Sequence, residues 1–385
     1  MPCPETKNFG RMRIGIDAKW YFTGPVSTRV VLQNLLPELF ALYPEHDWIV
    51  FLDKKDKSLG FPIQTGNIKL QYIWAGNNML SNVFLLSRKL NRLNLDVMLF
   101  QTFPSLRRKV PAISFIHDVL FRDFPQFFTW KERLYFLPLP WLTRNRSDRL
   151  IATTNFVSED LLKYHYTRNK SKIDLVPLGV RNSFKPLEYQ NRDLLLRVKE
   201  KYELPDRFLL YVGRLNVRKN IEALLKAIPL LKDTRISLVI IGKEDWKAPD
   251  LARLLFLPAI RKRVILTGAM TDEELMATYA LAEIFCFPSF AEGFGLPPLE
   301  AMASGVPALV SGSTALPEVC GNAAVYINPA EPASIASAAD ALLTDPDLYR
   351  RQQERGLERA KEFTWTRSAH AVMESINNAS KKQIL

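Results

Sequence analysis

The chain is 385 residues long, which is enough for two domains of the usual size of roughly 100–200 residues. Hydrophobic residues make up 47% and charged residues 24%, a composition typical of a globular protein and not of a disordered one. The three cysteines, Cys3, Cys286 and Cys320, have no paired spacing, which argues against a disulfide framework or a zinc site.

Short apolar segments alternate with helical patterns through the first half of the chain. Strands are expected over residues 12–17, 48–52, 96–100, 111–116, 148–153 and 173–177. A helix with apolar periodicity runs through the segment LPELFALY, and another begins near Ser158. Alternating strands and helices predict βαβ units joined into a parallel sheet.

The second half repeats this architecture but not its sequence. Strands are expected over 208–212, 237–241, 263–266, 284–287, 307–310 and 323–327, and helices over 220–231, 272–281, 297–304, 347–363 and 366–379. This pattern predicts a second doubly wound domain. Ligands of open α/β sheets bind at the carboxyl ends of the strands, so two facing domains would place a cleft there.

The polar and charged stretch 181–206 separates the two series and is expected to be the linker. The sequence therefore predicts one Rossmann-like domain over 1–185 and another over 186–365. The helix within 366–385 is expected to pack back towards the first domain.

The net charge of +12 is unevenly distributed. Residues 1–188 hold 27 Lys and Arg against 16 Asp and Glu, a balance of +11, whereas residues 189–385 hold 25 against 24. Basic charge concentrated in one half suggests that this half meets an anion. Nucleic acid, anionic lipid headgroups and a phosphate-bearing substrate all fit, and so does a basic surface that only keeps the protein soluble.

Residues 1–12 are polar and broken by proline, so we expect no signal peptide. No apolar run reaches the ~18 residues that a membrane span needs, which favours a cytoplasmic protein. The segment 79–93 (MLSNVFLLSRKLNRL) is apolar on one side and basic on the other. Such a segment could lie on the inner face of a membrane as a peripheral contact, or pack on the core with a solvated basic face.

The loop after the strand 208–212 carries two cations. The strand ends at Gly213, Arg214 and Lys219 follow, and the next helix is expected to start near Asn220. Two cations beside a helix N-terminus make a site for an anion, and arginine can hold phosphate oxygens with two hydrogen bonds. The alternative is a pair of exposed surface cations.

The loop after the strand 284–287 carries two carboxylates. Glu292 lies in the loop and Glu300 on the helix that follows, while Gly293 and Gly295 allow a tight turn with exposed backbone N–H groups. Carboxylates accept hydrogen bonds from paired hydroxyls, as on a sugar or a ribose. The alternative is that each acid complements the helix dipole.

These two loops resemble a known family. The run E-G-F-G-L-P-P-L-E-A-M-A-S-G-V-P, at 292–307, after a G-R-L-x3-K-N loop is similar to the retaining GT-B glycosyltransferases of family 4. Glu292 and Glu300 form the ends of the family's E-x7-E motif. The resemblance is specific over 208–327, and segment 115–128 (FIHDVLFRDFPQFF) resembles the mannosyltransferase-like bacterial members.

The resemblance implies a role for each matching position. Arg214 and Lys219 would neutralise the donor diphosphate, Glu292 would contact the donor sugar, and Glu300 would hold the ribose. Other donor-binding positions are Gly213 and the backbone of Gly293, Phe294, Gly295 and Leu296. His117 would lie on the first domain, near the sugar and the acceptor.

One loop departs from the family pattern. Many members carry two or three glycines after the first strand, whereas here the loop reads T-G-P-V-S-T, and only Gly24 remains. Pro25 also removes a backbone donor. We keep Gly24 as a close-approach position of the donor site, and the departure concerns the acceptor and phosphate contacts of this loop rather than the fold.

The resemblance also bears on metals. Asp345-Pro346-Asp347 is a literal D-x-D, but it precedes a charged helix, so Asp345 is expected to cap that helix. The family needs no metal or other cofactor, since the two cations would stabilise the leaving diphosphate.

The resemblance implies a fold and an activity. We expect a GT-B protein with an acceptor domain, then a donor domain, and a metal-independent hexosyltransferase that retains configuration. The donor is a nucleotide sugar, with GDP-mannose favoured, and the acceptor a saccharide or lipid-linked saccharide of cell-surface polysaccharide or glycoconjugate synthesis. The alternatives are a non-catalytic GT-B partner subunit or a GT-B sugar-nucleotide epimerase. A nucleic-acid partner is not expected, because no recognisable binding motif is present.

Overall fold

The computed structural model describes residues 10–74, 76–243 and 249–380. The chain folds into two compact units. The first unit consists of the chain up to Arg122, of Thr129–Leu178, and of the segment from Trp365 onwards. The second unit consists of Asp123–Phe128 and Gly179–Thr364.

Within the described residues, seven parallel strands form the sheet of the first unit, in the order β3-β2-β1-β4-β5-β6-β7. They are β1 (Arg13–Asp17), β2 (Asp47–Asp53), β3 (Ile68–Ile73), β4 (Val97–Gln101), β5 (Ala112–Ile116), β6 (Arg149–Ala152) and β7 (Ile173–Leu175). Because β4 pairs with β1 on the side opposite β2, the direction of winding reverses between β1 and β4. Ligands of doubly wound sheets bind at such a reversal.

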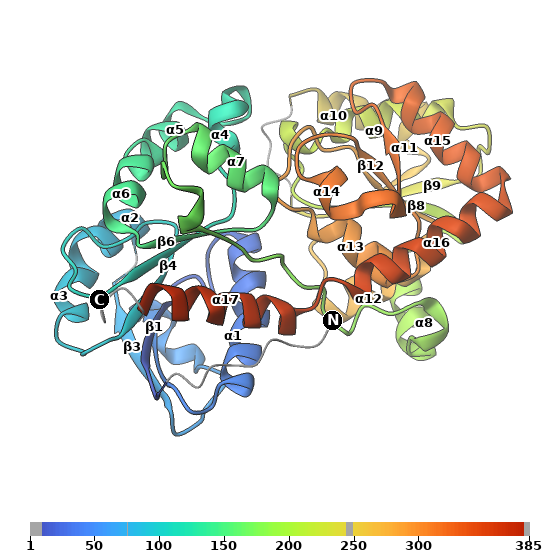
Figure 1. Cartoon of the computed structure of the whole chain (residues 1–385). Helices are drawn as coiled ribbons and strands as arrows, with labels where there is room; N and C mark the ends of the chain where they lie inside the picture. The colour runs from blue at the N-terminus through green and yellow to red at the C-terminus, as the bar shows by residue number, and fades with distance from the viewer. Residues whose placement is uncertain (1–9, 75, 244–248, 381–385) are drawn as a thin grey trace. The chain divides into compact units, whose positions relative to one another are not determined.

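Helices cover this sheet (Figure 1). They are α1 (Val26–Leu42), α2 (Asn78–Leu80), α3 (Leu86–Leu90), α4 (Leu120–Asp123), α5 (Trp130–Phe136), α6 (Leu139–Arg146), α7 (Asn155–Lys163) and α17 (Trp365–Ser380). Leu86 and Leu90 of α3 pack in one buried cluster with Phe51 of β2 and Phe100 of β4. The last helix, α17, packs on α1 and contacts β4 to β7.

In the described part of the second unit, six parallel strands pair in the order β10-β9-β8-β11-β12-β13. They are β8 (Phe208–Val212), β9 (Ser237–Ile241), β10 (Val264–Gly268), β11 (Ile284–Phe287), β12 (Ala308–Ser311) and β13 (Ala324–Ile327). The helices are α8 (Arg192–Lys201), α9 (Ile221–Ala227), α10 (Pro249–Leu255), α11 (Pro258–Arg261), α12 (Asp272–Leu281), α13 (Leu296–Ala303), α14 (Leu316–Cys320), α15 (Pro332–Thr344) and α16 (Pro346–Lys361).

Shorter helical turns join these elements. They are η1 (Lys54–Leu59), the π-helical η2 (Ser81–Leu85), η3 (Pro125–Phe127), η4 (Lys170–Lys172), η5 (Leu187–Tyr189), η6 (Val217–Lys219), η7 (Ile228–Leu230) and η8 (Gly321–Ala323). Of the helices described, none is both long and apolar enough to cross a bilayer.

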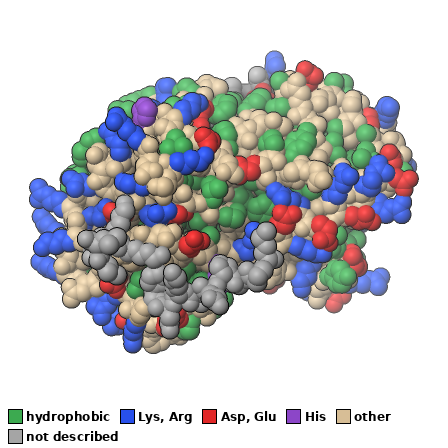
Figure 2. Space-filling model, viewed as in Figure 1, with side chains coloured by type: hydrophobic (Ala, Val, Ile, Leu, Met, Phe, Trp, Pro, Cys, Tyr) green, Lys and Arg blue, Asp and Glu red, His purple; other side chains and the backbone are tan. Residues whose placement is uncertain are grey.

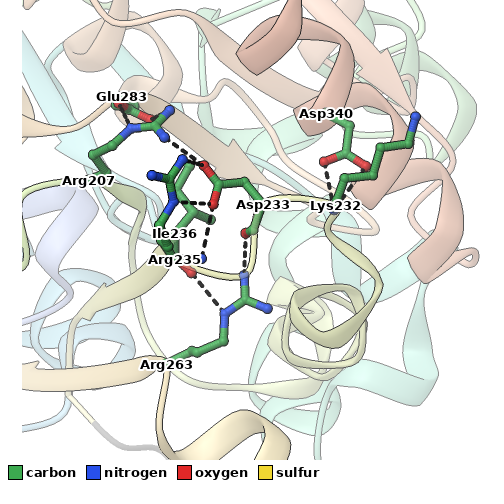
Figure 3. Close-up of polar contacts among 8 residues, drawn as sticks. All are labelled: Arg207, Lys232, Asp233, Arg235, Ile236, Arg263, Glu283 and Asp340. Atoms are coloured by element: carbon green, nitrogen blue, oxygen red, sulfur yellow. Dashed lines mark hydrogen bonds and ion pairs between the residues drawn. The ribbon is translucent and has the colours of Figure 1, made fainter.

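A polar network ties together the amino ends of strands in the second unit (Figure 3). Arg207, which precedes β8, pairs with Glu283 before β11 at 2.6 Å and with Asp233 before β9 at 2.6 Å. Arg263, which precedes β10, donates to the carbonyl oxygens of Asp233 at 3.0 Å and Ile236 at 2.9 Å. These contacts fix the amino edge of the sheet and leave the carboxyl edge to the loops that carry the motifs.

Three segments illustrate where the structure differs from the sequence-based expectations. Strand β3 was not predicted, because it is an edge strand on which only Ile73 is buried. The expected linker 181–206 contains helix α8, which the Asn191 side chain caps by accepting from the Leu194 N–H at 3.0 Å. The amphipathic segment 79–93 is helical up to Leu90, with a π-helical stretch over Ser81–Leu85, and it packs partly on the core.

Candidate donor-binding site

Neighbouring strands bring the two motif loops to one edge of the second sheet. β8 pairs with β11 in parallel, so the loops that follow Val212 and Phe287 both leave the carboxyl edge. The loop after β8 is held by Asn220, whose side-chain amide donates to the carbonyl oxygens of Pro288 at 3.1 Å and Pro329 at 2.6 Å. Asn220 has a φ of 55°, a left-handed conformation that asparagine tolerates.

The buried carboxylate of Glu292 is paired with two cations from the loop after β8. Its Oε1 lies 2.7 Å from Lys219 Nζ, and its Oε2 lies 3.1 Å from Arg218 Nη1. Burial alone would raise the pKa of Glu292, but attraction to Lys219 and Arg218 outweighs it and lowers the pKa to about 2. The site therefore holds an ionised carboxylate and two cations at neutral pH.

Arg218 was missed by the sequence analysis. Its guanidinium reaches both Glu292 and the carbonyl oxygen of Ala291. Its position directly before Lys219 was the available signal, since two adjacent cations in the loop after a strand point to an anion site. Arg214 begins the same loop and is exposed to solvent.

Gly213 takes part in a close backbone approach. A Cβ on Gly242, which follows β9, would lie 1.9 Å from the carbonyl oxygen of Gly213. The loop that carries Arg214 therefore starts from a crossing that has no room for a side chain at Gly242.

The glycine-rich turn leads into helix α13. Gly295 precedes α13 with a φ of 116°, which favours glycine, and a Cβ there would lie 2.6 Å from the Leu316 side chain. Phe294 is buried, and its ring packs edge-on against Phe363 at 5.8 Å. The phenyl ring thus anchors the turn, while Gly293, Gly295 and Leu296 bring the backbone to the same edge of the sheet.

Glu300 lies on α13 in different surroundings from Glu292. It is half-buried, and its Oε2 accepts a hydrogen bond from the Tyr279 hydroxyl at 3.0 Å. Burial raises the pKa of Glu300 to about 7, against the opposing attraction of Arg181 and the Tyr279 hydrogen bond. The two glutamates of the motif are therefore tuned in opposite directions.

His117 belongs to the first unit and follows β5. Its Nε2 lies 3.3 Å from the Gln101 side-chain oxygen, at the end of the neighbouring β4. Burial lowers the pKa of His117 to about 4, so the imidazole is neutral near pH 7. The sequence analysis missed Gln101, whose buried amide nitrogen has no hydrogen-bond partner within the ranges that the structure covers.

Gly24 follows β1, on the other side of the winding reversal from β4. Its φ is 137°, and a Cβ would lie 2.7 Å from the Trp20 ring. Nearby, Asp17, Lys19 and Asn82 form a buried network in which Asn82 donates to Asp17 Oδ2 at 2.7 Å. Glycine at position 24 is thus explained by its backbone and by its contact with Trp20.

Among the residues described, no three His, Cys, Asp or Glu side chains come together as metal ligands would. Asp345 of the D-x-D sequence accepts a hydrogen bond from the Leu348 N–H at 2.9 Å, as the cap of α16. The expected helix cap is therefore confirmed.

Family models match both halves of the chain. The model described as "Glycosyltransferase Family 4" matches residues 30–184, and "Glycosyl transferases group 1" matches residues 195–359. The O-antigen chain mannosyltransferase B of Escherichia coli is 31% identical over 258 residues, covering 66% of this chain and 67% of that protein.

A second relative is longer than this chain. The serotype-specific mannosyltransferase WbdA of Escherichia coli is 34% identical over 236 residues, which are 60% of this chain but only 28% of WbdA. Among solved structures, the sucrose-phosphate synthase of Thermosynechococcus elongatus superposes with a TM-score of 0.74 at 18% identity, covering 94% of this chain and 98% of that one. The structural likeness confirms the expected pair of Rossmann-like domains with parallel sheets.

Proposed function

This chain belongs to glycosyltransferase family 4 and has the GT-B fold, and we propose that it transfers mannose from GDP-mannose to a saccharide or lipid-linked saccharide acceptor. Both bacterial relatives are named mannosyltransferases, which supports mannose as the sugar. One of them is named for the O-antigen chain, which supports a role in surface polysaccharide synthesis.

The observation that carries the proposal is the pairing of Glu292 with Lys219 and Arg218 beside the exposed Arg214. When a glycosyl–phosphate bond breaks, negative charge develops on the diphosphate and positive charge on the sugar. Fixed cations stabilise the developing negative charge, and they need no reorganisation if they are already held in place. Lys219 and Arg214 would bind the diphosphate, and Arg218 would keep Glu292 ionised.

The two glutamates take different parts in donor binding. Glu292, ionised and buried, would accept hydrogen bonds from hydroxyls of the donor sugar. Glu300 would hold the ribose hydroxyls, and the backbone of Gly293 to Leu296 would lie against the sugar and phosphate. Gly213 would let the backbone approach the donor closely.

Residues of the first unit would complete the reaction. His117, neutral and hydrogen-bonded to Gln101, would lie near the sugar and the acceptor, and Gly24 would allow a close approach of the donor. We propose retention of configuration, with the acceptor attacking on the face that the diphosphate leaves, and no metal requirement. We also propose a cytoplasmic enzyme that meets the inner face of the membrane through its basic half.

The test is a thermal-shift screen with GDP, UDP, dTDP and ADP and their common sugar conjugates. A ligand that binds the native state raises the melting temperature by mass action. GDP-mannose should stabilise the wild type, and Arg214→Ala should lose that effect. Arg197→Ala, which removes an exposed arginine on α8, should keep it.

Stabilisation by UDP, dTDP or ADP in place of GDP would change the donor but keep the site. If no nucleotide stabilised the protein at millimolar concentration, the proposal of a donor site would be wrong, and a non-catalytic partner subunit would take its place. If mannose-containing donors bound but were isomerised without transfer, the epimerase reading would replace a transferase.

A further inference from the structure

The helical run 130–146 carries an apolar stripe that faces solvent. Trp130, Leu134, Leu137 and Trp141 are spaced four, three and four residues apart, which places them on one face of a helix. The backbone between α5 and α6 stays in the right-handed helical region, so the stripe continues across both helices. The four side chains are 63%, 58%, 59% and 51% exposed.

The hydrophobic core of the first unit does not need this stripe. The inward side of the same run packs through Phe136, which stacks on Phe121 at 5.2 Å and Phe103 at 6.0 Å, and through the buried Leu139 and Leu142. A surface helix usually has one apolar face, directed at the core. This run has a second one, which indicates an apolar partner outside the unit.

A neighbouring segment extends the surface. The hydroxyl oxygen of Tyr135 on α5 accepts a hydrogen bond from the backbone N–H of Met79 on α2 at 3.1 Å, so the two segments adjoin. Beyond Met79, the side chains of Leu80, Phe84 and Leu85 are 41%, 55% and 45% exposed. We call these three residues and the stripe the apolar surface.

Cations flank the apolar stripe within the run 130–146. Lys131, Arg133, Arg144 and Arg146 are all exposed, and Glu132 is the only carboxylate between residues 130 and 146. Glu132 is engaged in the capping box of α5, where its Oε2 accepts from the Thr129 N–H at 2.7 Å. Over α5 and α6, at the upper left, Figure 2 shows hydrophobic side chains interleaved with Lys and Arg. A partner that complements this surface would therefore be both apolar and anionic.

We propose that the apolar surface docks on an anionic lipid bilayer. Tryptophan and leucine on one helical face, with lysine and arginine beside them, are typical of helices that lie at the boundary between headgroups and acyl chains. A protein groove or a second copy of this chain would need an apolar patch ringed by carboxylates. The inference extends the proposed function, since a lipid-linked acceptor lies in such a bilayer. Its evidence, however, is only the exposed apolar and basic side chains of this surface.

The test is flotation of the purified protein with two kinds of vesicle, pure phosphatidylcholine and an equal mixture with phosphatidylglycerol. The wild type should bind the anionic vesicles, and raised salt should weaken the binding. Trp130→Ser with Leu134→Ser and Trp141→Ser should weaken it at least ~10-fold, because the buried apolar area is lost. The matched control is Tyr189→Ser with Leu196→Ser and Phe256→Ser, three exposed apolar residues of the second unit that should leave binding unchanged.

A charge variant tests the anionic part of the proposal without touching the apolar side chains. Lys131→Gln with Arg133→Gln and Arg144→Gln should reduce binding to anionic vesicles to the level seen with phosphatidylcholine. Arg192→Gln with Arg197→Gln, exposed on α8, is its control. Vesicle binding is compared only among variants whose melting temperature matches that of the wild type.

The proposal is overturned if the wild type binds neither vesicle or if the serine variant binds as well as the wild type. It is also overturned if the wild type sediments as a dimer that the serine variant breaks while vesicles bind neither protein, since a second copy then covers the surface. The nucleotide screen is independent: vesicle binding without any nucleotide effect would remove the proposed function and leave this surface standing.

Discussion

Glu292 and Glu300 are eight positions apart, yet their surroundings give them opposite dependences on pH. The folded-state pKa of Glu300 is raised from 4.5 to about 7, so its protonated form is favoured in the native state. Stability from Glu300 is present below pH 4.5 and is lost as pH rises to about 7. The melting temperature of wild type relative to Glu300→Gln should fall across that window and stay level above it.

The same comparison with Glu292→Gln should have the opposite sign. The folded-state pKa of Glu292 is lowered from 4.5 to about 2, so its contribution is present above pH 4.5 and lost as pH falls towards 2. The advantage of wild type over Glu292→Gln should shrink as the pH falls from 4.5 to about 2. Parallel slopes for the two variants would mean that the ion pairs with Lys219 and Arg218 do not hold Glu292 ionised.

Lys219 is the residue on which the charge arrangement of the site depends most directly, because its Nζ lies 2.7 Å from Glu292. Lys219→Ala removes a cation from the proposed diphosphate site and leaves Glu292 with Arg218. We expect kcat/KM for donor turnover to fall roughly 10²–10³-fold, the usual loss when one charge-stabilising donor is removed. Lys226→Ala removes an exposed lysine on α9 and should change kcat/KM by less than about twofold. Equal losses of kcat/KM in both variants would mean that Lys219 has no specific part in the reaction.

At the scale of elements, the sequence predicts what is set by local pattern. The buried strands β8, β9 and β11 were expected at their observed bounds, because a short apolar run bounded by polar loops is typical of a buried strand. Helix α12 was likewise expected at Asp272–Leu281, where Thr271 and Glu274 form a capping box.

Elements that depend on tertiary contacts were harder to predict. β3 has a mixed polar sequence and becomes a strand only by pairing with β2 at the edge of the sheet. α8 was hidden in a charged stretch, since Val198 is its one buried side chain in the structure. The same limit applies to the site. The motif identified Lys219 and Glu292. Gln101 is distinguished only by its contact with His117, and the place of Arg218 beside Lys219 did not reveal its ion pair with Glu292.

The crossing of the loops after β8 and β9 gives a prediction at this scale. A Cβ on Gly242 would lie 1.9 Å from the carbonyl oxygen of Gly213, which is backbone and cannot rotate away. Gly242→Ala should therefore displace the loop that carries Arg214 and lower the free energy of unfolding by roughly 1–3 kcal/mol, measured by urea denaturation. Gly66→Ala, where no atom lies within 4 Å of the added Cβ, should have little effect on the free energy of unfolding. If Gly242→Ala also left that free energy unchanged, the backbone at the crossing would be able to move apart without cost.

At the scale of the whole molecule, the two units differ in their charge and in the sites that they carry. The basic excess lies in residues 1–188, whereas the paired carboxylate and cations lie in the second unit. Figure 2 shows Lys and Arg side chains along the outer edge of the first unit, at the left of the view. The proposed donor site of one unit and the proposed lipid contact of the other can thus be changed separately by mutation.

The chain returns to the first unit at its end, and this return provides a test of how independently the units unfold. Helix α17 packs on α1, and its Ser375 hydroxyl donates to Asp174 at 2.6 Å. Ile376 is fully buried on α17, so Ile376→Ala should destabilise the first unit by roughly 2–5 kcal/mol. The exposed Glu374→Ala on the same helix is the control.

Calorimetry with and without the donor nucleotide distinguishes the two outcomes. If the units unfold separately, Ile376→Ala lowers one transition, and the nucleotide raises only the other, because a ligand stabilises the unit that binds it. A single transition that shifts with both changes would mean that the units unfold together. In that case α17, which continues directly from the second unit at Thr364, would be the covalent and packed connection that couples them.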